Sequence, residues 1–269
     1  MTPYIICSSP RSGTNLLRHL LTWHKIGIPT EIHRDYIDFR RTPVEEMESV
    51  FQIEYLHNFL KGCNFVPAHR DYSNIPIEYY SRTVWSFQFH EMIKNLRGVA
   101  SLDSVADKDV LSTLYPGIKY IYLYRKDKIK QAVSIEMARQ SDEWLVTKTM
   151  PVDRYTDYSY DFGDLARELI WRFDAEVVWQ DIFEEFDIRP LVLCHEDFLA
   201  DMVQGLADIA EFLGAGIAYP SPEYIEKSLS HASAPIKPVS PTKTEWVNFV
   251  HRDLDRIRTY TRHLTERIP

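Results

Sequence analysis

The sequence predicts a three-layer α/β fold, in which helices cover a central, mostly parallel sheet, with helical insertions. Two observations support this prediction. Short apolar runs are each followed by a helical pattern, and a loop of small residues separates the first run from the first helix. Apolar runs without polar alternation are typical of parallel sheets that are covered on both faces. With 269 residues, 45% of them hydrophobic, the chain is long enough for a single domain over residues 1–269.

The predicted strands and helices alternate along the chain. The pairs are strand Tyr4–Cys7 with helix Leu16–Trp23, strand Thr83–Phe89 with helix His90–Leu96, strand Gly117–Tyr124 with helix Lys128–Arg139, and strand Arg189–Cys194 with helix Leu199–Leu213. Periodic apolar residues predict further helices over Pro43–Leu60, Phe162–Phe186 and Thr244–His263. The prolines of Ala234–Pro241 predict an exposed loop before the last helix.

Composition excludes several classes of protein. The formal charge of −8 argues against a general nucleic-acid binder, which needs basic surface. No apolar run approaches the ~20 residues of a membrane span, and the N-terminus lacks a signal-peptide pattern, so we expect a cytoplasmic protein. Cys7, Cys63 and Cys194 have neither metal-ligand nor disulfide-framework spacing. Cys7 and Cys194 are expected to be buried in strands.

The loop after the first strand has the features of an anion-binding site. Small residues let an anion approach the backbone, and the next helix offers its N-terminal N–H groups. Arg11 adds a positive charge whose donor fork suits oxyanions. The residues expected to contact the anion are Pro10, Arg11, Ser12, Gly13, Thr14 and Asn15. The alternative interpretation is a turn before a capped helix.

This loop differs from the phosphate loop of kinases and ATPases, G-x-x-x-x-G-K-[ST], because it lacks the first glycine and the lysine. Those enzymes also hold Mg²⁺ with a loop hydroxyl and an acidic residue after a second strand. Here the strand that ends at Tyr124 is followed by a cation, Arg125. A nucleoside triphosphate is therefore a poor match for this loop.

Arg125 and Ser134 form a second candidate element. Ser134 lies nine positions after Arg125, on the following helix. Ligands of open α/β sheets bind at the carboxyl ends of the strands, so the two side chains are placed to hold one phosphate. Each residue alone is more simply a surface arginine or an ordinary helix serine. Combined with the first loop, the pair favours a functional interpretation.

The two elements together resemble a known family. A P-R-S-G-T loop, followed after a later strand by R-x-D and Q-A-V-S, is similar to the PAPS-dependent sulfotransferases and, more narrowly, to the bacterial trehalose 2-sulfotransferase family. Gly27–Glu31 resembles that family's G-x-P-x-E segment, and Glu245–Trp246 resembles its late E-W pair. The resemblance runs from about residue 4 to residue 255, strong at the two elements and weak between them.

The resemblance implies a P-loop-like fold and transfer of a sulfuryl group from PAPS, the co-substrate, without a metal. The acceptor would be a hydroxyl of a small molecule, either a carbohydrate or a glycolipid. The loop would bind the 5′-phosphosulfate, with Arg11 at the sulfuryl end, and Arg125 with Ser134 would bind the 3′-phosphate. Because relatives can be dimeric, a homodimer stays open. One residue departs from the pattern: Gln88 stands where the family usually has a lysine in a G-x-K-like strand.

The reaction needs a base that takes the proton of the acceptor hydroxyl. By the resemblance, Glu31 faces the sulfuryl group, and a carboxylate in a partly closed cleft can have a raised pKa. His33 competes for the role because imidazole titrates nearer neutrality. In an extended segment the two residues share a face, so the sequence leaves open which is the base.

Other residues have both a functional and a structural interpretation. A flap over the nucleotide or a solvated loop would each explain Lys237, Lys243 and Trp246. Stacking on a sugar ring is possible for Tyr155, Tyr158 and Tyr160, near Trp144, but packing is the preferred interpretation. The segment His195–Asp197 could face the cleft, but helix capping by Asp197 is preferred. Two other functions stay open. The missing loop lysine argues against a small-molecule kinase, whereas Gln88 leaves room for a non-catalytic nucleotide-binding module.

Overall fold

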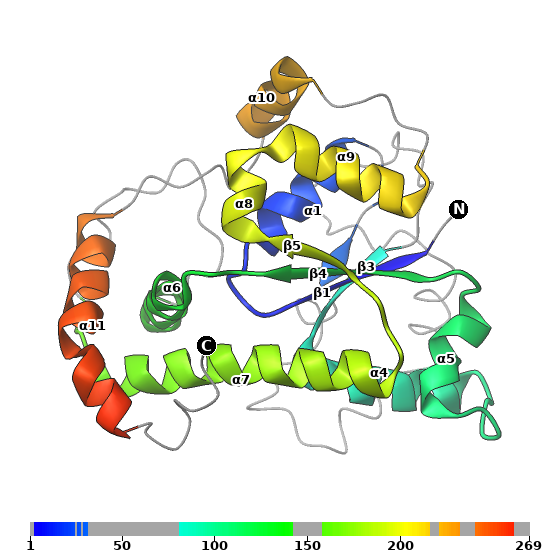
Figure 1. Cartoon of the computed structure of the whole chain (residues 1–269), viewed down its shortest axis with the longest axis horizontal. Coiled ribbons are helices and arrows are strands. Elements are labelled where there is room, and N and C mark those ends of the chain that lie inside the picture. The colour runs from blue at the N-terminus through cyan, green and yellow to red at the C-terminus, as the bar shows by residue number, and fades with distance from the viewer. Residues whose placement is uncertain are drawn as a thin grey trace.

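The computed structural model describes residues 3–24, 26, 27, 29–31, 81–141, 158–215, 221–231 and 240–260. In this part of the chain a five-stranded sheet lies at the centre, in the order β2-β3-β1-β4-β5, and every neighbouring pair is parallel (Figure 1). The strands are β1 (Tyr4–Ser8), β2 (Thr30–Glu31), β3 (Ser81–Trp85), β4 (Lys119–Tyr124) and β5 (Leu191–Cys194). The parallel pairing confirms the predicted α/β class.

Helices on both sides of the sheet complete three layers (Figure 1). One layer contains α1 (Thr14–Trp23), α8 (His195–Ala200), α9 (Met202–Leu213) and α10 (Pro222–His231), and the other contains α4 (Ser86–Val99), α5 (Asp107–Leu114) and α7 (Phe162–Glu185). Two more helices, α6 (Lys128–Ser141) and α11 (Pro241–Tyr260), lie beyond the carboxyl ends of the strands. They pack against α7 through a separate apolar cluster.

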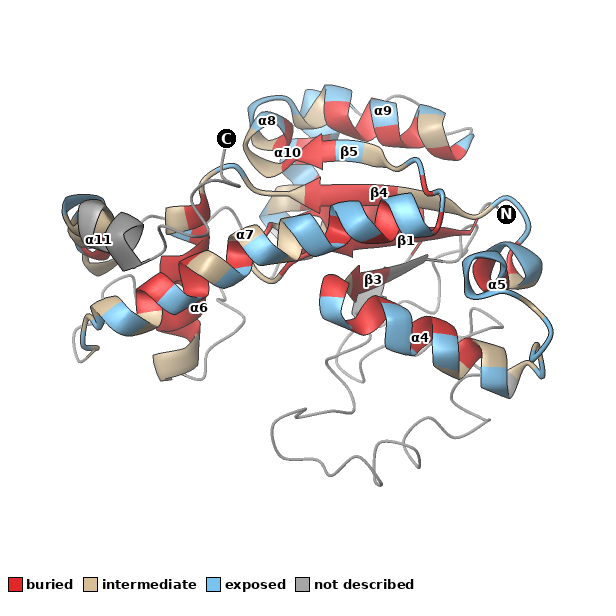
Figure 2. Ribbon diagram, turned by 60° about the horizontal axis from the view of Figure 1, so that its bottom comes forward, coloured by how far each residue is buried: buried red, intermediate tan, exposed pale blue. Residues whose placement is uncertain are grey.

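Strand β1 shows why the predicted strands lack polar alternation. Tyr4 and Ile6 pack on the side of α1 and α9, whereas Ile5 and Cys7 pack on the side of α4 and α7. Since both faces are covered, every residue of the strand is buried. Helix α7, by contrast, is covered on one side only: a buried stripe faces the sheet and the opposite side is exposed (Figure 2). Cys194 is also buried, in β5, as predicted.

The prediction of a strand over Thr83–Phe89 is wrong at its carboxyl end. The strand ends at Trp85, and α4 begins at Ser86. Gln88 explains the early start of the helix, because its side-chain Oε1 accepts a hydrogen bond from the backbone N–H of Trp85 at 3.2 Å. A side chain in the first turn that binds the N-cap amide stabilises a helix start.

Two other helix boundaries also differ from the prediction. The helix expected over Leu199–Leu213 is interrupted at Asp201, whose side chain accepts a hydrogen bond from the N–H of Gln204 at 2.9 Å and so caps α9. The last helix begins at Pro241 rather than Thr244, because proline suits the first position of a helix.

The predicted helix Pro43–Leu60 and most of the predicted loop Ala234–Pro241 lie outside the described residues. Of the helices in the described ranges, none combines the length and the apolar character that a membrane span requires.

Candidate active site

The loop after β1 has an unusual backbone conformation. Arg11 has φ 64° and Gly13 has φ 100°, both in the left-handed region. For a residue other than glycine this costs on the order of 1–3 kcal/mol, so the strain at Arg11 points to a functional constraint. The first intrahelical bonds of α1 run from Leu16 and Leu17 to the Gly13 carbonyl, at 3.0 and 3.2 Å. The preceding amides of the helix start are therefore available to a ligand.

Ser12 adds an unpaired hydroxyl to this loop. The residue is fully buried, and its Oγ has no hydrogen-bond partner. Buried polar groups in proteins are nearly always hydrogen-bonded. An orphaned hydroxyl at an anion loop is consistent with a ligand oxygen as its missing partner.

Two buried side chains from distant helices fix the loop, and sequence reasoning missed both. The indole Nε1 of Trp179 in α7 donates to the Ser8 carbonyl at 2.9 Å. The amide Nε2 of Gln131 in α6 donates to the Pro10 carbonyl at 2.7 Å and to the Ser9 hydroxyl at 3.0 Å. Gln131 belongs to the Q-A-V-S motif, so its motif position was the one available signal.

His195 packs directly on Gly13. A Cβ atom added at Gly13 would lie 2.2 Å from Nδ1 of the His195 ring, so only glycine fits there. Burial and the neighbouring Arg125 lower the pKa of His195, which favours a neutral imidazole. His195 therefore faces the site, which is the less favoured of the two sequence interpretations.

The structure brings together three of the predicted site residues. The Arg11 Nε donates to the Ser134 hydroxyl at 3.0 Å, and an Arg125 Nη1 donates to the Arg11 carbonyl at 3.3 Å. They come from the loop, the end of β4 and the second turn of α6. These three residues are far apart in the sequence but lie together beside the loop. We call Arg11, Arg125 and Ser134 the cationic wall.

A carboxylate of the His195–Asp197 segment positions Arg125, a role that the sequence did not indicate. Glu196 accepts hydrogen bonds from the backbone N–H groups of Lys126, at 2.9 Å, and Asp127, at 3.2 Å. It also forms a 3.4 Å ion pair with Arg125. Burial would raise the pKa of Glu196, but these backbone hydrogen bonds outweigh it and lower the pKa to about 2.

The same turn is held from the opposite side. Lys128, a buried residue, donates from its ammonium group to the Arg125 carbonyl and to the Glu176 carboxylate of α7. The expected capping role of Asp197 is wrong, since this residue lies inside α8 and its carboxylate pairs with Lys126 at 2.8 Å. Arg125 thus projects from a turn that is fixed on both sides.

The electrostatics of the site favour a bound anion. Lys243, at the start of α11, lies close enough to Arg11 and Arg125 for their charges to act on it. Desolvation is the largest cause, and together with the two guanidinium charges it lowers the pKa of Lys243 to about 7. Burial also lowers the pKa of Arg125, against the opposing effect of Glu196. Cations that disfavour one another's charge are stabilised by an anion placed between them.

Glu31 lies on the other side of β1 from Arg125, because the strand order is β2-β3-β1-β4-β5. It is the last residue of β2 and pairs with Thr83 of β3, which in turn pairs with Ile6 of β1. Its backbone is thus two strands away from β1, or about 10 Å, and it is level with Ile6, two residues before β1 ends. His33 lies outside the described residues.

Gln88 lies in the first turn of α4 and not in a strand. It is buried, with its Oε1 on the Trp85 amide and its Nε2 without a partner. Trp85 pairs with Ser8, so the carboxamide lies one strand away from the start of the loop. A neutral cap occupies the place where the resemblance led us to expect a lysine.

Among the aromatic candidates, Tyr160 is a packing residue. Its ring lies edge-on to Trp246 at 5.9 Å, and its hydroxyl donates to Asp253 at 3.1 Å. Trp246 is itself buried in the cluster of α6, α7 and α11. Tyr155, Trp144 and Lys237 lie outside the described residues.

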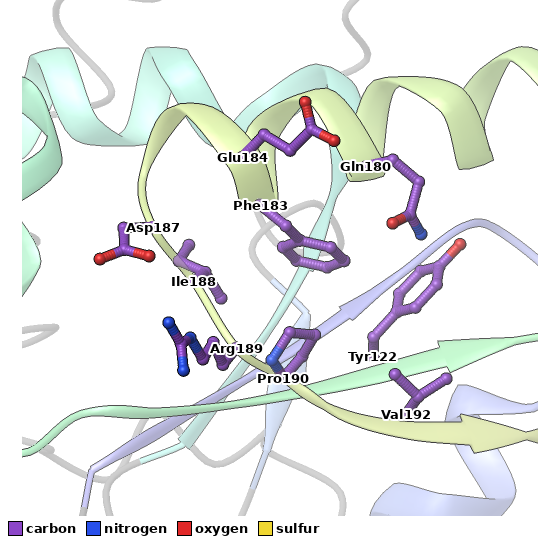
Figure 3. A pocket seen from close by; sticks show the side chains of 9 residues that line it. All are labelled: Tyr122, Gln180, Phe183, Glu184, Asp187, Ile188, Arg189, Pro190 and Val192. Carbon is purple, nitrogen blue, oxygen red and sulfur yellow. The ribbon is translucent and has the colours of Figure 1, made fainter.

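A surface hollow of about 420 Å³ lies between α7 and β5, where α7 leaves the sheet uncovered (Figure 3). Val192 is 58% exposed there. The hollow is lined by Tyr122, Gln180, Phe183, Glu184, Asp187, Ile188, Arg189, Pro190 and Val192. These residues do not include any predicted site residue, so the hollow is separate from the cationic wall.

Comparisons with known proteins identify the family of this chain. A family model described as Stf0 sulphotransferase matches residues 82–234, which include Arg125 and Ser134. Among solved structures, the chain is similar to a sulfotransferase from Alicyclobacillus acidocaldarius, with 15% identity and a TM-score of 0.37 over 96% of this chain and 99% of that one. No curated protein matches the chain. Since the family match spans more than half of its residues, the chain belongs to the Stf0 sulphotransferase family, a family of PAPS-dependent transferases.

Proposed function

We propose that the protein transfers the sulfuryl group of PAPS to a hydroxyl of a carbohydrate or glycolipid. The observation that carries this proposal is the contact of Arg11 with both Ser134 and Arg125 beside a loop of free amides. PAPS has a phosphate on the 3′ position and a phosphosulfate on the 5′ position of its ribose, so it needs two adjacent anion sites. A simple phosphate or a nucleoside monophosphate needs only one.

The loop and the cationic wall take different parts of the donor. The amides of Gly13, Thr14 and Asn15 and the Ser12 hydroxyl bind the 5′-phosphosulfate. Arg125 and Ser134 bind the 3′-phosphate. Since the Arg11 side chain lies on Ser134, its guanidinium acts at the 3′-phosphate as well, while its strained backbone shapes the loop.

Transfer proceeds by in-line displacement. The acceptor oxygen forms a bond to sulfur while the bond from sulfur to the 5′-phosphate oxygen breaks, and the electron pair of that bond stays on the departing PAP. The hydroxyl proton goes to a base, for which Glu31 is our first choice and His33 our second. The resemblance supports Glu31, which ends β2 and, through Thr83 of β3, is in register with Ile6 of β1.

Ligand binding tests the donor proposal without an acceptor. PAP should raise the melting temperature more than AMP does, since AMP lacks the 3′-phosphate, and Ser134→Ala should reduce the difference between the two. ATP with Mg²⁺ should have the weaker effect. Failure of PAP to stabilise the protein would contradict the proposal, and preferred stabilisation by ATP–Mg²⁺ with ATP turnover would indicate a kinase.

A screen of sugars, glycolipids and phenols with labelled PAPS tests the acceptor class. With an acceptor in hand, Glu31→Gln should lower turnover by roughly 10²–10⁴-fold and leave PAP binding unchanged, since it removes only the base. His33→Gln is the matched variant. If it abolishes turnover while Glu31→Gln retains it, His33 is the base.

A further inference from the structure

Helix α7, which runs along one face of the sheet and on to α6 (Figure 1), contacts both donor elements. Trp179 donates its indole N–H to the carbonyl of Ser8, where β1 leads into the loop, at 2.9 Å. Glu176, three residues earlier, accepts a hydrogen bond from the ammonium group of Lys128, the first residue of α6. Residues three apart are neighbours on a helix surface, so one short stretch of α7 supports both elements.

The peptide unit that follows Arg125 is held at both of its polar ends. Its carbonyl accepts a hydrogen bond from the Lys128 ammonium group, and its N–H, which belongs to Lys126, donates to Glu196 at 2.9 Å. A peptide unit is planar, so holding both ends restrains the backbone dihedral ψ of Arg125. Strand β4 fixes the residue on its other side. The direction in which the Arg125 side chain leaves the backbone is set by these contacts.

Lys128 depends on Glu176 for this role. The Lys128 side chain is 7% exposed, and burying a charge is costly unless it is paired and hydrogen-bonded. The ring of Tyr124 lies 5.7 Å from the ammonium group and favours a cation, but it carries no charge. The carboxylate of Glu176 supplies the negative charge. It therefore keeps the ammonium group in place beneath the Arg125 carbonyl.

We propose that Glu176 and Trp179 are positioning residues for the donor, each for one of its phosphates. Glu176 acts through Lys128 on Arg125, and so on the 3′-phosphate. Trp179 acts through the Ser8 carbonyl on the loop, and so on the 5′ group. This inference rests on the proposed function, since it assumes that PAPS is the donor. It adds that one turn of α7 sets separately how much each phosphate contributes to binding.

Charge and position have opposite effects in the variant Glu176→Gln. The substitution removes a negative charge near a site for anions, so electrostatics alone would make PAP bind more tightly. Loss of the anionic partner of Lys128 instead frees the turn and weakens the hold of Arg125 on the 3′-phosphate. We expect position to dominate, with PAP affinity about tenfold lower, as for one charge-assisted hydrogen bond. AMP affinity should change little, because AMP lacks the 3′-phosphate.

The variant Trp179→Phe addresses the other phosphate. It removes the indole N–H but keeps an aromatic ring against Phe183, on which the indole stacks at 5.4 Å. PAP and AMP both place a 5′-phosphate in the loop, so both should bind several-fold more weakly and by the same factor. The ratio of PAP affinity to AMP affinity should thus fall in Glu176→Gln and stay at the wild-type value in Trp179→Phe. A change in folding stability alone would move neither ratio, because both ligands bind the same folded state.

Calorimetric titration of the full chain with PAP and with AMP measures these ratios, and melting curves check that each variant is folded. Lys128→Met, alone and combined with Glu176→Gln, tests the route. Lys128→Met should also lower the ratio, and Glu176→Gln should add nothing further in that background, since it acts through Lys128. Asp174→Asn is the matched control, because it removes an exposed carboxylate from the same helix. Both of its affinities should equal those of the wild type.

Unchanged or tighter PAP binding in Glu176→Gln, an equal loss of PAP and AMP binding, or full additivity with Lys128→Met would overturn the role of Glu176. Wild-type affinities or a changed ratio in Trp179→Phe would contradict the role of Trp179. The comparison at Glu176 decides the inference even if Trp179→Phe does not fold. These results leave the proposed function intact, whereas absence of PAP binding to the wild type would count against that function.

Discussion

Glu196 illustrates how one side chain can fix the position of another residue, here Arg125, that is expected to bind the ligand. Its carboxylate holds the turn after β4 through two backbone amides and one guanidinium. Replacing Arg125 would remove a cation. Replacing Glu196 would keep the positive charge of Arg125 but remove the contacts that orient it, so experiments can distinguish the roles of the two residues.

The first prediction concerns the variant Glu196→Gln. Gln keeps one acceptor oxygen but loses the charge and the second acceptor, so PAP affinity should fall by about tenfold. Titration of PAP into both proteins measures the effect. Glu211→Gln, at an exposed position on α9, is the control and should not change it. Unchanged affinity in Glu196→Gln would mean that Arg125 is positioned without this carboxylate.

The second prediction concerns acid. Because the folded-state pKa of Glu196 lies at about 2, below its ordinary value of 4.5, its stabilisation is complete above pH 4.5 and is lost as the pH falls towards 2. Unfolding followed by circular dichroism between pH 5 and 2 should therefore be less steep in Glu196→Gln than in the wild type. Identical acid profiles would contradict this assignment.

The third prediction concerns the contact between Gly13 and His195. Gly13→Ala should destabilise the protein by roughly 1–3 kcal/mol, because the added Cβ meets the His195 ring and the backbone is left-handed. His195→Ala removes the ring, so the double variant should be more stable than the sum of the single changes predicts. Urea unfolding of all four proteins measures this coupling. A strictly additive result would leave backbone strain as the whole effect.

At the scale of secondary-structure elements, local patterns were enough to predict most strands and helices. The apolar runs at β1, β4 and β5 and the periodic patterns of α1, α6 and α7 were each recognisable within a short window. The start of α4 at Ser86 was not predicted, because the hydrogen bond from the Trp85 amide to the Gln88 side chain determines it. The contacts that fix the loop were missed for another reason: Gln131 and Trp179 lie 122 and 171 positions from the loop residues that they bind. For Trp179 the local pattern gives no sign of such a partner, and for Gln131 its place in the Q-A-V-S motif is the one sign.

The fourth prediction tests the cap of α4. Gln88→Met removes the oxygen that accepts from the Trp85 amide and should cost about 1 kcal/mol of stability. Gln88→Glu keeps an acceptor oxygen there but buries a carboxylate, so it should also be less stable than the wild type at neutral pH and should recover stability as the pH falls and the carboxyl group is protonated. Thermal or urea unfolding compares the three proteins. If both variants unfold like the wild type, the hydrogen bond does not contribute to the start of this helix.

At the scale of the whole molecule, the site exists only because the parallel sheet gathers the ends of its strands at one edge. The loop, the turn after β4, the second turn of α6 and the start of α11 are distant in sequence, yet they border one region. The order of the strands was not predictable from the sequence, since several orders suit the same apolar runs. The resemblance supplied the two donor elements. The fold places Lys243 and Glu196, for which the sequence left a functional and a structural interpretation open, beside them.

The fifth prediction follows from this assembly. PAP should slow amide hydrogen exchange simultaneously in residues 9–15, 125–134 and 240–243, because one ligand stabilises all three segments. Helices α5 and α10, away from these segments, serve as internal controls and should exchange at unchanged rates. Hydrogen exchange with mass spectrometry resolves segments of this size. Protection confined to residues 9–15 would indicate a smaller site, without α6 and α11.

The central position of β1 also has a consequence for synthesis. Its two neighbours, β3 and β4, begin at Ser81 and Lys119, so the strand emerges from the ribosome long before either partner exists. At about 5–20 residues per second, β1 waits on the order of ten seconds for β4, with apolar side chains on both of its faces. The loop after β1 is thus translated before the other segments of the candidate site and is one of the last to acquire its shape.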